Sequence, residues 1–341
     1  MTNSRNNGVT FETLNDDSRR GRVVGYNHGA PYVNRSKAKA IDIAGLKNED
    51  KRNIITNPLD DDGSRFTIGF EVEKNRFHRS ALKEHALFAR LENDVSCGFA
   101  QGQQGFEAIT HILPLVGRSM WRTKVYNMFV EARQIIEDEF SPSNSRCGGH
   151  IHLSCVGMDS EELLERVRRF SGIVYSIYRK RLGNTFCSNN FRMQGEGGKY
   201  VPCRLNSYGV EFRLPSRVQS VKQMMRRYEL MYVIMDFACN TPLGRVPAGT
   251  MARFRNALKP ILMSMYERDA DKVKNIMDLA GHFQKYLTTG KVTCHTIGWL
   301  EARWSSVNRR VGRCEPDYVR GLEFNFDYLE WMAEQEVLRL L

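Results

Sequence analysis

The chain has 341 residues, a formal net charge of +11, 41% hydrophobic residues and 26% charged residues, which is typical of an ordinary soluble protein with one large or two medium domains. No stretch approaches the roughly 18 to 20 apolar residues that span a bilayer, and residues 1–5 lack an apolar signal core, so we expect a cytoplasmic protein with no membrane partner. The eight cysteines show no CxxC spacing, which argues for reduced thiols and against a zinc knuckle or redox dithiol. Because Lys and Arg are spread along the whole chain, a nucleic-acid partner is allowed but not favoured.

The chain divides into three parts. Residues 1–64 are polar, have few apolar clusters and end in an acidic turn over 57–64, which predicts an extended arm or loosely packed lead-in. From about Arg65 to residue 240, short apolar runs alternate with helical stretches. Residues 241–341 have mostly helical spacing, for example over 324–338, which predicts a helical extension.

The first predicted strand of the middle part, over 65–73, contains two carboxylates. Glu71 and Glu73 are two residues apart in a run that otherwise reads as a buried strand. Because strand side chains alternate faces, both acids share one face while Phe70 and Val72 take the other. A second strand is predicted over 104–113, ended by Pro114, followed by a helix from about 121 to 140.

The same pairing recurs on two later strands. His150 and His152 bracket Ile151, and Glu211 and Arg213 bracket Phe212. Between these strands, a capping box at Asp159 starts a predicted helix that continues to residue 177, and another helix is predicted from about 218 to 239. Strands interleaved with helices predict an α+β or α/β layer whose helices cover the face that the charged residues do not use.

Four carboxylates would face one cavity if four strands are neighbours: Glu71, Glu73, Glu107 and Glu211. Two unit charges 4 Å apart repel by about 4 kcal/mol at an effective dielectric of about 20, so divalent cations are expected among them. Oxygen ligands favour Mg²⁺ or Mn²⁺, and an imidazole from His150 or His152 is tolerated more readily by Mn²⁺.

Each pair also has an ordinary interpretation. The two acids could lie on an exposed edge strand, the histidines could be satisfied and half-buried, and Glu211 and Arg213 could form a cross-strand salt bridge. Their joint occurrence on three strands favours a shared site.

A cavity with metals and an arginine suits a nucleoside triphosphate, with Arg213 stabilising charge on the transferred phosphoryl group and Arg204 or Arg192 assisting. The glycine-rich segment 195–199 lacks the spacer and the Ser or Thr of a P-loop, so we interpret it as a flap. The chain has no HExxH, no GxSxG and no dinucleotide-binding GxGxxG between a strand and a helix, which argues against a metalloprotease, a serine hydrolase or a Rossmann enzyme.

An ordered series of motifs resembles the amidoligase family, the carboxylate-amine ligases of the glutamine synthetase and glutamate-cysteine ligase superfamily. The motifs are GFEVE (69–73), ENDVS (92–96), GFEAITHILPL (105–115), CGGHIHLS (147–154), and LN (205–206) leading into GVEFRLPS (209–216). They cover about residues 66–240 and leave both ends unexplained. Arg217 and Val218 follow the last motif at positions where relatives often have Gly and Thr. This departure from the family pattern bears on the expected substrate pocket more than on the expected metal cluster.

The resemblance implies an α+β fold, with a glutamine-synthetase-like antiparallel sheet that has helices on one face, and a catalytic domain over 65–240. ATP and Mg²⁺, or Mn²⁺, are the implied cofactors. By position, the implied metal ligands are Glu71, Glu73, Glu107, His152 and Glu211. The implied catalytic residues are Arg213, Glu211 and His150, and the implied nucleotide-binding residues are His152, Arg213 and Arg204. The implied substrate-binding residues are Asp94, Ser96 and Asn206.

The leading hypothesis is therefore an ATP-dependent ligase that joins a small-molecule or peptide carboxylate to an amine through an acyl phosphate. One alternative is an ATP phosphotransferase of similar fold, because guanidino kinases share a similar sheet. Another is an inactive basic structural or nucleic-acid-associated protein, supported by the +11 charge and the polar arm. The sequence reveals neither the substrates nor the oligomeric state.

Overall fold

In the computed structural model of the chain, the structure is described for residues 3–4, 9–10, 66–76, 87–97, 105–117, 120–144, 146–155, 157–182, 201–206 and 209–300. Several predicted features lie outside these residues: most of the arm over 1–64, Arg192, the flap over 195–199 and the helical spacing over 324–338.

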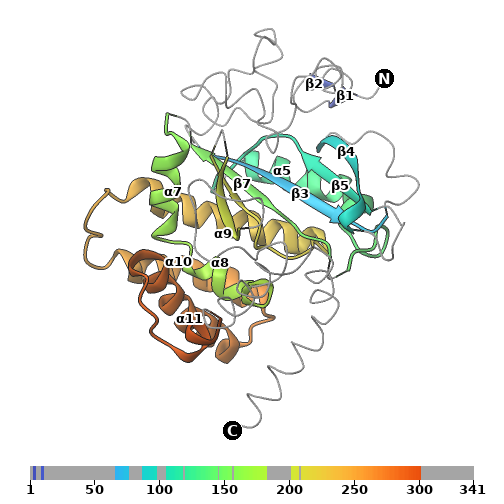
Figure 1. The fold of residues 1–341 in the computed structure, drawn as a ribbon. Helices are drawn as coiled ribbons and strands as arrows, with labels where there is room; N and C mark the ends of the chain where they lie inside the picture. Colours follow the sequence, from blue (N-terminus) through green and yellow to red (C-terminus); the bar gives the residue numbers. More distant parts are fainter. Residues whose placement is uncertain are drawn as a thin grey trace, which may run out of the picture.

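The centre of the molecule is an open antiparallel sheet (Figure 1). Its strands, in spatial order, are β4 (Phe88–Asp94), β5 (Gly105–Thr110), β3 (Phe66–Lys74), β7 (Ile151–Cys155), β9 (Gly209–Phe212) and β8 (Cys203–Asn206), with the short β6 (Leu113–Pro114) also paired to β3. All neighbours run antiparallel, so the fold class is α+β. A separate pair joins β1 (Asn3–Ser4) to β2 (Val9–Thr10).

One face of this sheet is apolar and carries the core. Phe70 of β3 packs edge-on against Phe129 with 5.9 Å between ring centroids, and Phe129 packs in the same way against Tyr228 at 6.5 Å. These two partners come from helices α5 (Met120–Glu131) and α9 (Val221–Asn240), which lie with α7 (Ser160–Arg168) on this side of the sheet (Figure 1). The helices therefore leave the other face to the charged side chains.

Lys74 is a charged exception on the apolar face. Its side chain is fully buried, and its Nζ donates to the carbonyls of Ile136 and Val218 and to Asp138 Oδ1, each at 2.8 Å. Burial lowers the pKa of Lys74, against the opposing effect of Asp138. The ammonium therefore connects the end of β3 to two segments by hydrogen bonds. One segment is the end of α6 (Arg133–Ile136) with the residues after it, and the other lies just before α9.

The remaining helices extend the core below the sheet. They are α8 (Gly172–Ile177), α10 (Thr250–Met265) and α11 (Ala270–Thr289), with the 3₁₀ turns η3 (Val95–Cys97) and η4 (Arg179–Arg181). α11 packs closely on α8, because Ser176 Oγ donates to the Ile276 carbonyl at 2.7 Å and a Cβ at Gly172 would come within 2.4 Å of the Ala280 carbonyl. Among the described residues, no helix is long and apolar enough to cross a membrane.

The structure corrects several predicted boundaries. The helix predicted over 159–177 does begin at the cap, where Asp159 accepts from the Glu162 N–H at 2.7 Å, but it breaks between α7 and α8. At that break, Ser171 Oγ donates back to the Val167 carbonyl at 2.6 Å. The helix predicted over 121–140 likewise divides into α5 and α6, and Pro114 pairs within β6 instead of only ending β5. Strands β4 and β8, which the alternation of apolar residues did not predict, form the two edges of the sheet.

Candidate functional site

The strand register brings the predicted site residues onto one face. Opposite residues of antiparallel strands share a face, and His152 lies opposite Glu211, which in turn lies opposite Arg204. On the other side of β3, Glu107 lies opposite both Glu73 and Glu92. Strands β5, β3, β7 and β9 are consecutive neighbours, which is the arrangement that a shared cavity requires.

Glu71 is the centre of this face. One of its carboxylate oxygens lies 2.5 Å from His150 Nδ1, and the other lies 2.8 Å from His152 Nε2. The side chain is buried, which by itself would raise its pKa, but the two histidines outweigh burial and hold the pKa of Glu71 well below its ordinary value. Glu71 therefore stays ionised between the two imidazoles.

Glu211 lies between two guanidinium groups. Its Oε1 accepts from Arg213 Nη1 at 2.6 Å, and its Oε2 accepts from Arg204 at 2.6 Å. Burial opposes ionisation, but His152 and Arg213 lower the pKa of Glu211 overall. Glu211 and Arg213 do form an ion pair, but along one segment of the chain and not across strands; the cross-strand partner of Glu211 is Arg204. Glu211 belongs to the same network as His152.

Glu107 has the opposite electrostatic balance. Burial, the charge of Glu71 and a hydrogen bond with Glu71 raise the pKa of Glu107 well above its ordinary value. Glu107 is therefore harder to ionise than an exposed glutamate. A cation bound between Glu107 and Glu71 would favour the ionised form of both carboxylates.

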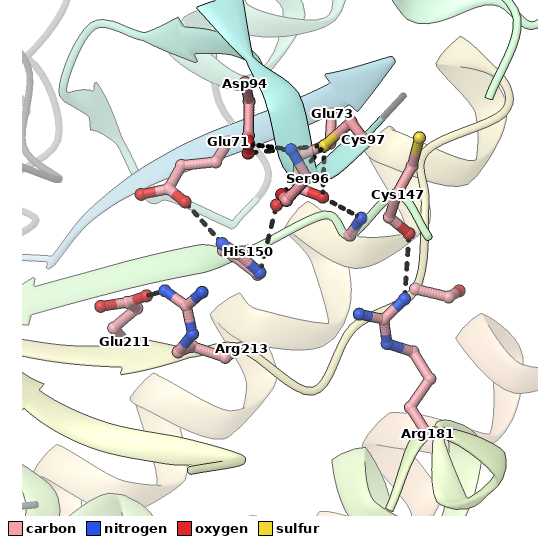
Figure 2. A network of polar contacts seen from close by, with 12 residues as sticks. Glu71, Glu73, Asp94, Ser96, Cys97, Cys147, His150, Arg181, Glu211 and Arg213 are labelled. Atoms are coloured by element: carbon pink, nitrogen blue, oxygen red, sulfur yellow. Dashed lines mark hydrogen bonds and ion pairs between the residues drawn. The ribbon is translucent and has the colours of Figure 1, made fainter. Parts of the chain in front are cut away.

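Glu73 organises the end of the face nearest β4. Its Oε2 accepts from the Gly148 N–H at 2.5 Å and from Cys97 Sγ at 3.2 Å, while its Oε1 lies 3.5 Å from His150 Nε2. His150 therefore bridges Glu71 and Glu73 (Figure 2). A Cβ at Gly148 would come within 2.8 Å of His150 Nε2, so the close approach requires glycine there.

Two buried arginines position the loop that precedes the histidines. Arg181 Nη1 donates to the Cys147 carbonyl at 2.9 Å (Figure 2), and Arg227 donates to the carbonyls of Ser216 and Arg217 at 2.7 and 2.9 Å. Gly149 packs directly on Arg227, because a Cβ would lie 2.4 Å from Arg227 Nη1. These contacts fix the start of β7 and hence the direction of His150.

The three predicted substrate residues lie at two places. Asp94 Oδ1 accepts from the Ser96 N–H at 2.8 Å, and both residues lie at the η3 turn beside Cys97. Asn206 lies instead on β8, with its Nδ2 2.9 Å from His152 Nδ1. Which of the two atoms donates depends on the tautomer of His152. In either case, Asn206 contacts the histidine in this structure.

The donor sets fit divalent cations. Among the residues that the structure describes, three groups each offer three ligand atoms within 4.8 Å of one another: Glu71, His152 and Glu211; Glu71, Glu107 and His150; Glu73, Asp94 and Cys97. The first two contain only carboxylate oxygens and imidazole nitrogens, which suit Mg²⁺ or Mn²⁺. Every predicted metal ligand belongs to at least one group.

The site also contains residues that the sequence analysis did not assign. Cys97 lies between Glu73 and Cys147, and a hydrogen bond with Cys147, burial and the charge of Glu73 raise the pKa of the Cys97 thiol. The sequence feature that could have predicted Cys97 is its distance of three residues from Asp94, across a short turn. Glu92 belongs to the ENDVS motif, but the strand that carries it was not predicted.

Comparisons with known proteins give little further information. No family model matches the chain, and no curated protein matches it. Among solved structures, the ligand-free structure of GmaS, a gamma-glutamylmethylamide synthetase, covers 74% of this chain over 73% of its own length, with 12% sequence identity and a TM-score of 0.33. A likeness this loose carries no argument about the present chain.

Proposed function

We propose that the chain is an ATP-dependent carboxylate-amine ligase with a glutamine-synthetase-like catalytic sheet. The observation that carries this proposal is the position of Glu71, held by both histidines, with Glu107 and Glu211 on the adjoining strands. The motif series from GFEVE to GVEFRLPS supports the same function.

The charges of the face support a cation-dependent reaction. Burial and the charges of Glu71, Glu73 and Asp94 raise the pKa of Glu107, which indicates a local excess of negative charge. Bound divalent cations would neutralise this excess and the charge that develops on a transferred phosphoryl group. Glu71, His152 and Glu211 would hold one cation, and Glu71, Glu107 and His150 a second.

The arginines supply the anion-binding part of the site. Arg213 and Arg204 both donate to Glu211. When Glu211 turns to a cation, these guanidinium groups become donors for nucleotide phosphate oxygens. Their position beside the carboxylates suits ATP, whose phosphates carry charge that both arginines and cations neutralise.

The proposed reaction has two displacement steps. A substrate carboxylate oxygen attacks the γ-phosphorus of ATP, the bond from that phosphorus to the β,γ-bridging oxygen breaks, and ADP leaves. The amine nitrogen then attacks the acyl carbon, the bond to the phosphate oxygen breaks, and phosphate leaves as the nitrogen loses its proton to a base. We assign Asp94 and Ser96, at the β4 end of the face, to the amine or carboxylate substrate.

The mass of the product tests this proposal. Purified full-length protein is incubated with ATP, Mg²⁺ and pools of carboxylates and amines, and ADP and new masses are measured. We expect amine-dependent ADP release and a product that lacks one water relative to its two parts. Glu73→Ala and Glu211→Ala should abolish both signals, whereas Glu165→Ala, an acid-to-alanine change at an exposed position of α7, should leave them unchanged.

Two results would contradict the proposal. A product one phosphoryl group heavier than a substrate, formed without an amine, would identify a phosphotransferase. ADP release that persists unchanged in Glu73→Ala and Glu211→Ala would show that the acidic face is not the site of reaction.

A further inference from the structure

The third group of ligand atoms differs chemically from the other two because it contains sulfur. Cys97 Sγ lies 3.2 Å from Glu73 Oε2 and 3.5 Å from Asp94 Oδ2 (Figure 2). Cys97 is fully buried and Glu73 nearly so. The thiol therefore faces two carboxylate oxygens instead of the apolar core.

The surrounding backbone holds these three groups in place. Asp94 uses Oδ1 to accept from the Ser96 N–H at 2.8 Å, which leaves Oδ2 directed to Cys97. Gly148 N–H fixes Glu73 Oε2 at 2.5 Å. The ligand atoms are thus positioned before any ion binds, and pre-positioned ligands lose little freedom on binding.

A buried acceptor lies on the residue that anchors the same turn. The Asn75 side chain is 3% exposed, and its Nδ2 donates to the Cys97 carbonyl, which anchors the amide on η3. Its Oδ1 is buried and has no hydrogen-bond partner among the described residues, which costs free energy.

We propose that Glu73, Asp94 and Cys97 form a distinct cation position that takes a thiophilic divalent ion such as Zn²⁺, with the Cys97 sulfur bound as thiolate. One thiol with carboxylate oxygens suits zinc or cobalt, whereas Mg²⁺ binds oxygen and avoids sulfur. Binding forms a metal–sulfur bond, breaks the S–H bond and releases one proton to solvent. The inference rests on the proposed function through two shared residues, Glu73 and Asp94, the second of which is assigned there to a substrate.

Cobalt provides the test because a thiolate bound to Co²⁺ gives an absorption band that oxygen and nitrogen ligands do not give. Reduced, chelator-treated, full-length protein is titrated with Co²⁺ in the presence of excess Mg²⁺. We expect a thiolate-to-cobalt band that saturates at one equivalent, disappears on adding Zn²⁺ and persists in excess Mg²⁺. Cys97→Ser should remove the band, and Cys239→Ser, at a buried cysteine of α9, should retain it.

A second measurement on the unaltered protein covers the case in which Cys97→Ser fails to fold. Zn²⁺ should slow the alkylation of Cys97 by at least tenfold in peptide-level mass spectrometry and leave that of Cys239 unchanged. A folded protein without the band, a band that persists in Cys97→Ser, or equal alkylation with and without Zn²⁺ would overturn the inference.

The two proposals fail separately. Amide formation with Mg²⁺ but no cobalt band would remove the thiolate position alone. A cobalt band without any ATP-dependent product would remove the ligase and leave the thiolate position.

Discussion

The two faces of strand β3 both bury charge, but in different ways. On the apolar face, the single ammonium of Lys74 meets three acceptors, Asp138 Oδ1 and two carbonyls, each at 2.8 Å. On the polar face, Glu71, Glu73, Glu107 and Glu211 crowd around two histidines, and the pKa of Glu107 is raised as a result.

The contrast between Lys74 and the carboxylate cluster distinguishes a charge that stabilises the fold from charges that are expected to bind a ligand. A buried charge whose hydrogen bonds are all made connects segments of the fold, and its removal leaves acceptors unpaired. A cluster with surplus charge of one sign costs stability and is expected where a ligand supplies the opposite charge. Substitutions on the two faces should therefore have opposite effects on stability and activity.

The largest expected effect comes from Glu107→Gln, which mimics the protonated acid. Because the pKa of Glu107 is raised in the fold, its ionisation opposes folding, and this cost grows as the pH rises above the ordinary pKa of a glutamate. Glutamine removes that cost but also removes a cation ligand. We expect ATP-dependent product formation to fall about 100- to 1000-fold, while metal-free stability in urea stays equal or rises. A variant that loses stability along with activity would assign Glu107 a structural role.

Lys74→Met should show the opposite pattern. It leaves the two carbonyls without this donor and Asp138 without its cationic partner, so we expect a loss of about 3 kcal/mol in the free energy of unfolding. Urea denaturation measures this loss, and activity per folded molecule should remain. A stable Lys74→Met protein would remove the contrast between the two faces.

Metal removal should affect the polar face alone. Mn²⁺ at one hundred times its dissociation constant should stabilise the protein by about 2.7 kcal/mol, because it binds only the folded state. Thermal unfolding with and without chelator measures the shift, which should be much smaller in Glu71→Gln and preserved in the exposed-site variant Glu165→Ala. An equal shift in Glu71→Gln would place the ion elsewhere.

The smallest effect concerns His111, a buried histidine between β5 and β6. Burial lowers the pKa of His111 from 6.5 to about 3, so the unfolded chain takes up a proton that the folded chain excludes. Stability is therefore lost as the pH falls below 6.5, by about 2 kcal/mol between pH 7 and pH 5. His111→Gln should flatten this part of the stability profile in urea titrations at each pH. An unchanged slope would mean that His111 titrates normally.

Much of the site could be predicted because its residues interrupt apolar strands. Glu71 and Glu73 stand out in β3, and His150 and His152 in β7, since ionisable pairs at a spacing of two are costly in buried strands. Edge strands β4 and β8 carry many polar side chains, so alternation of apolar residues did not reveal them. Cys97 joins the site only through the η3 turn, and no spacing rule relates it to Glu73 on another strand.

The most direct test of the central claim is a crystal of the full chain soaked with Mn²⁺ and a non-hydrolysable ATP analogue. Anomalous scattering should place Mn²⁺ between Glu71, His152 and Glu211 and between Glu71, Glu107 and His150, with analogue phosphates beside Arg213. Manganese and analogue bound elsewhere, with Glu71 still hydrogen-bonded to both histidines, would contradict the account.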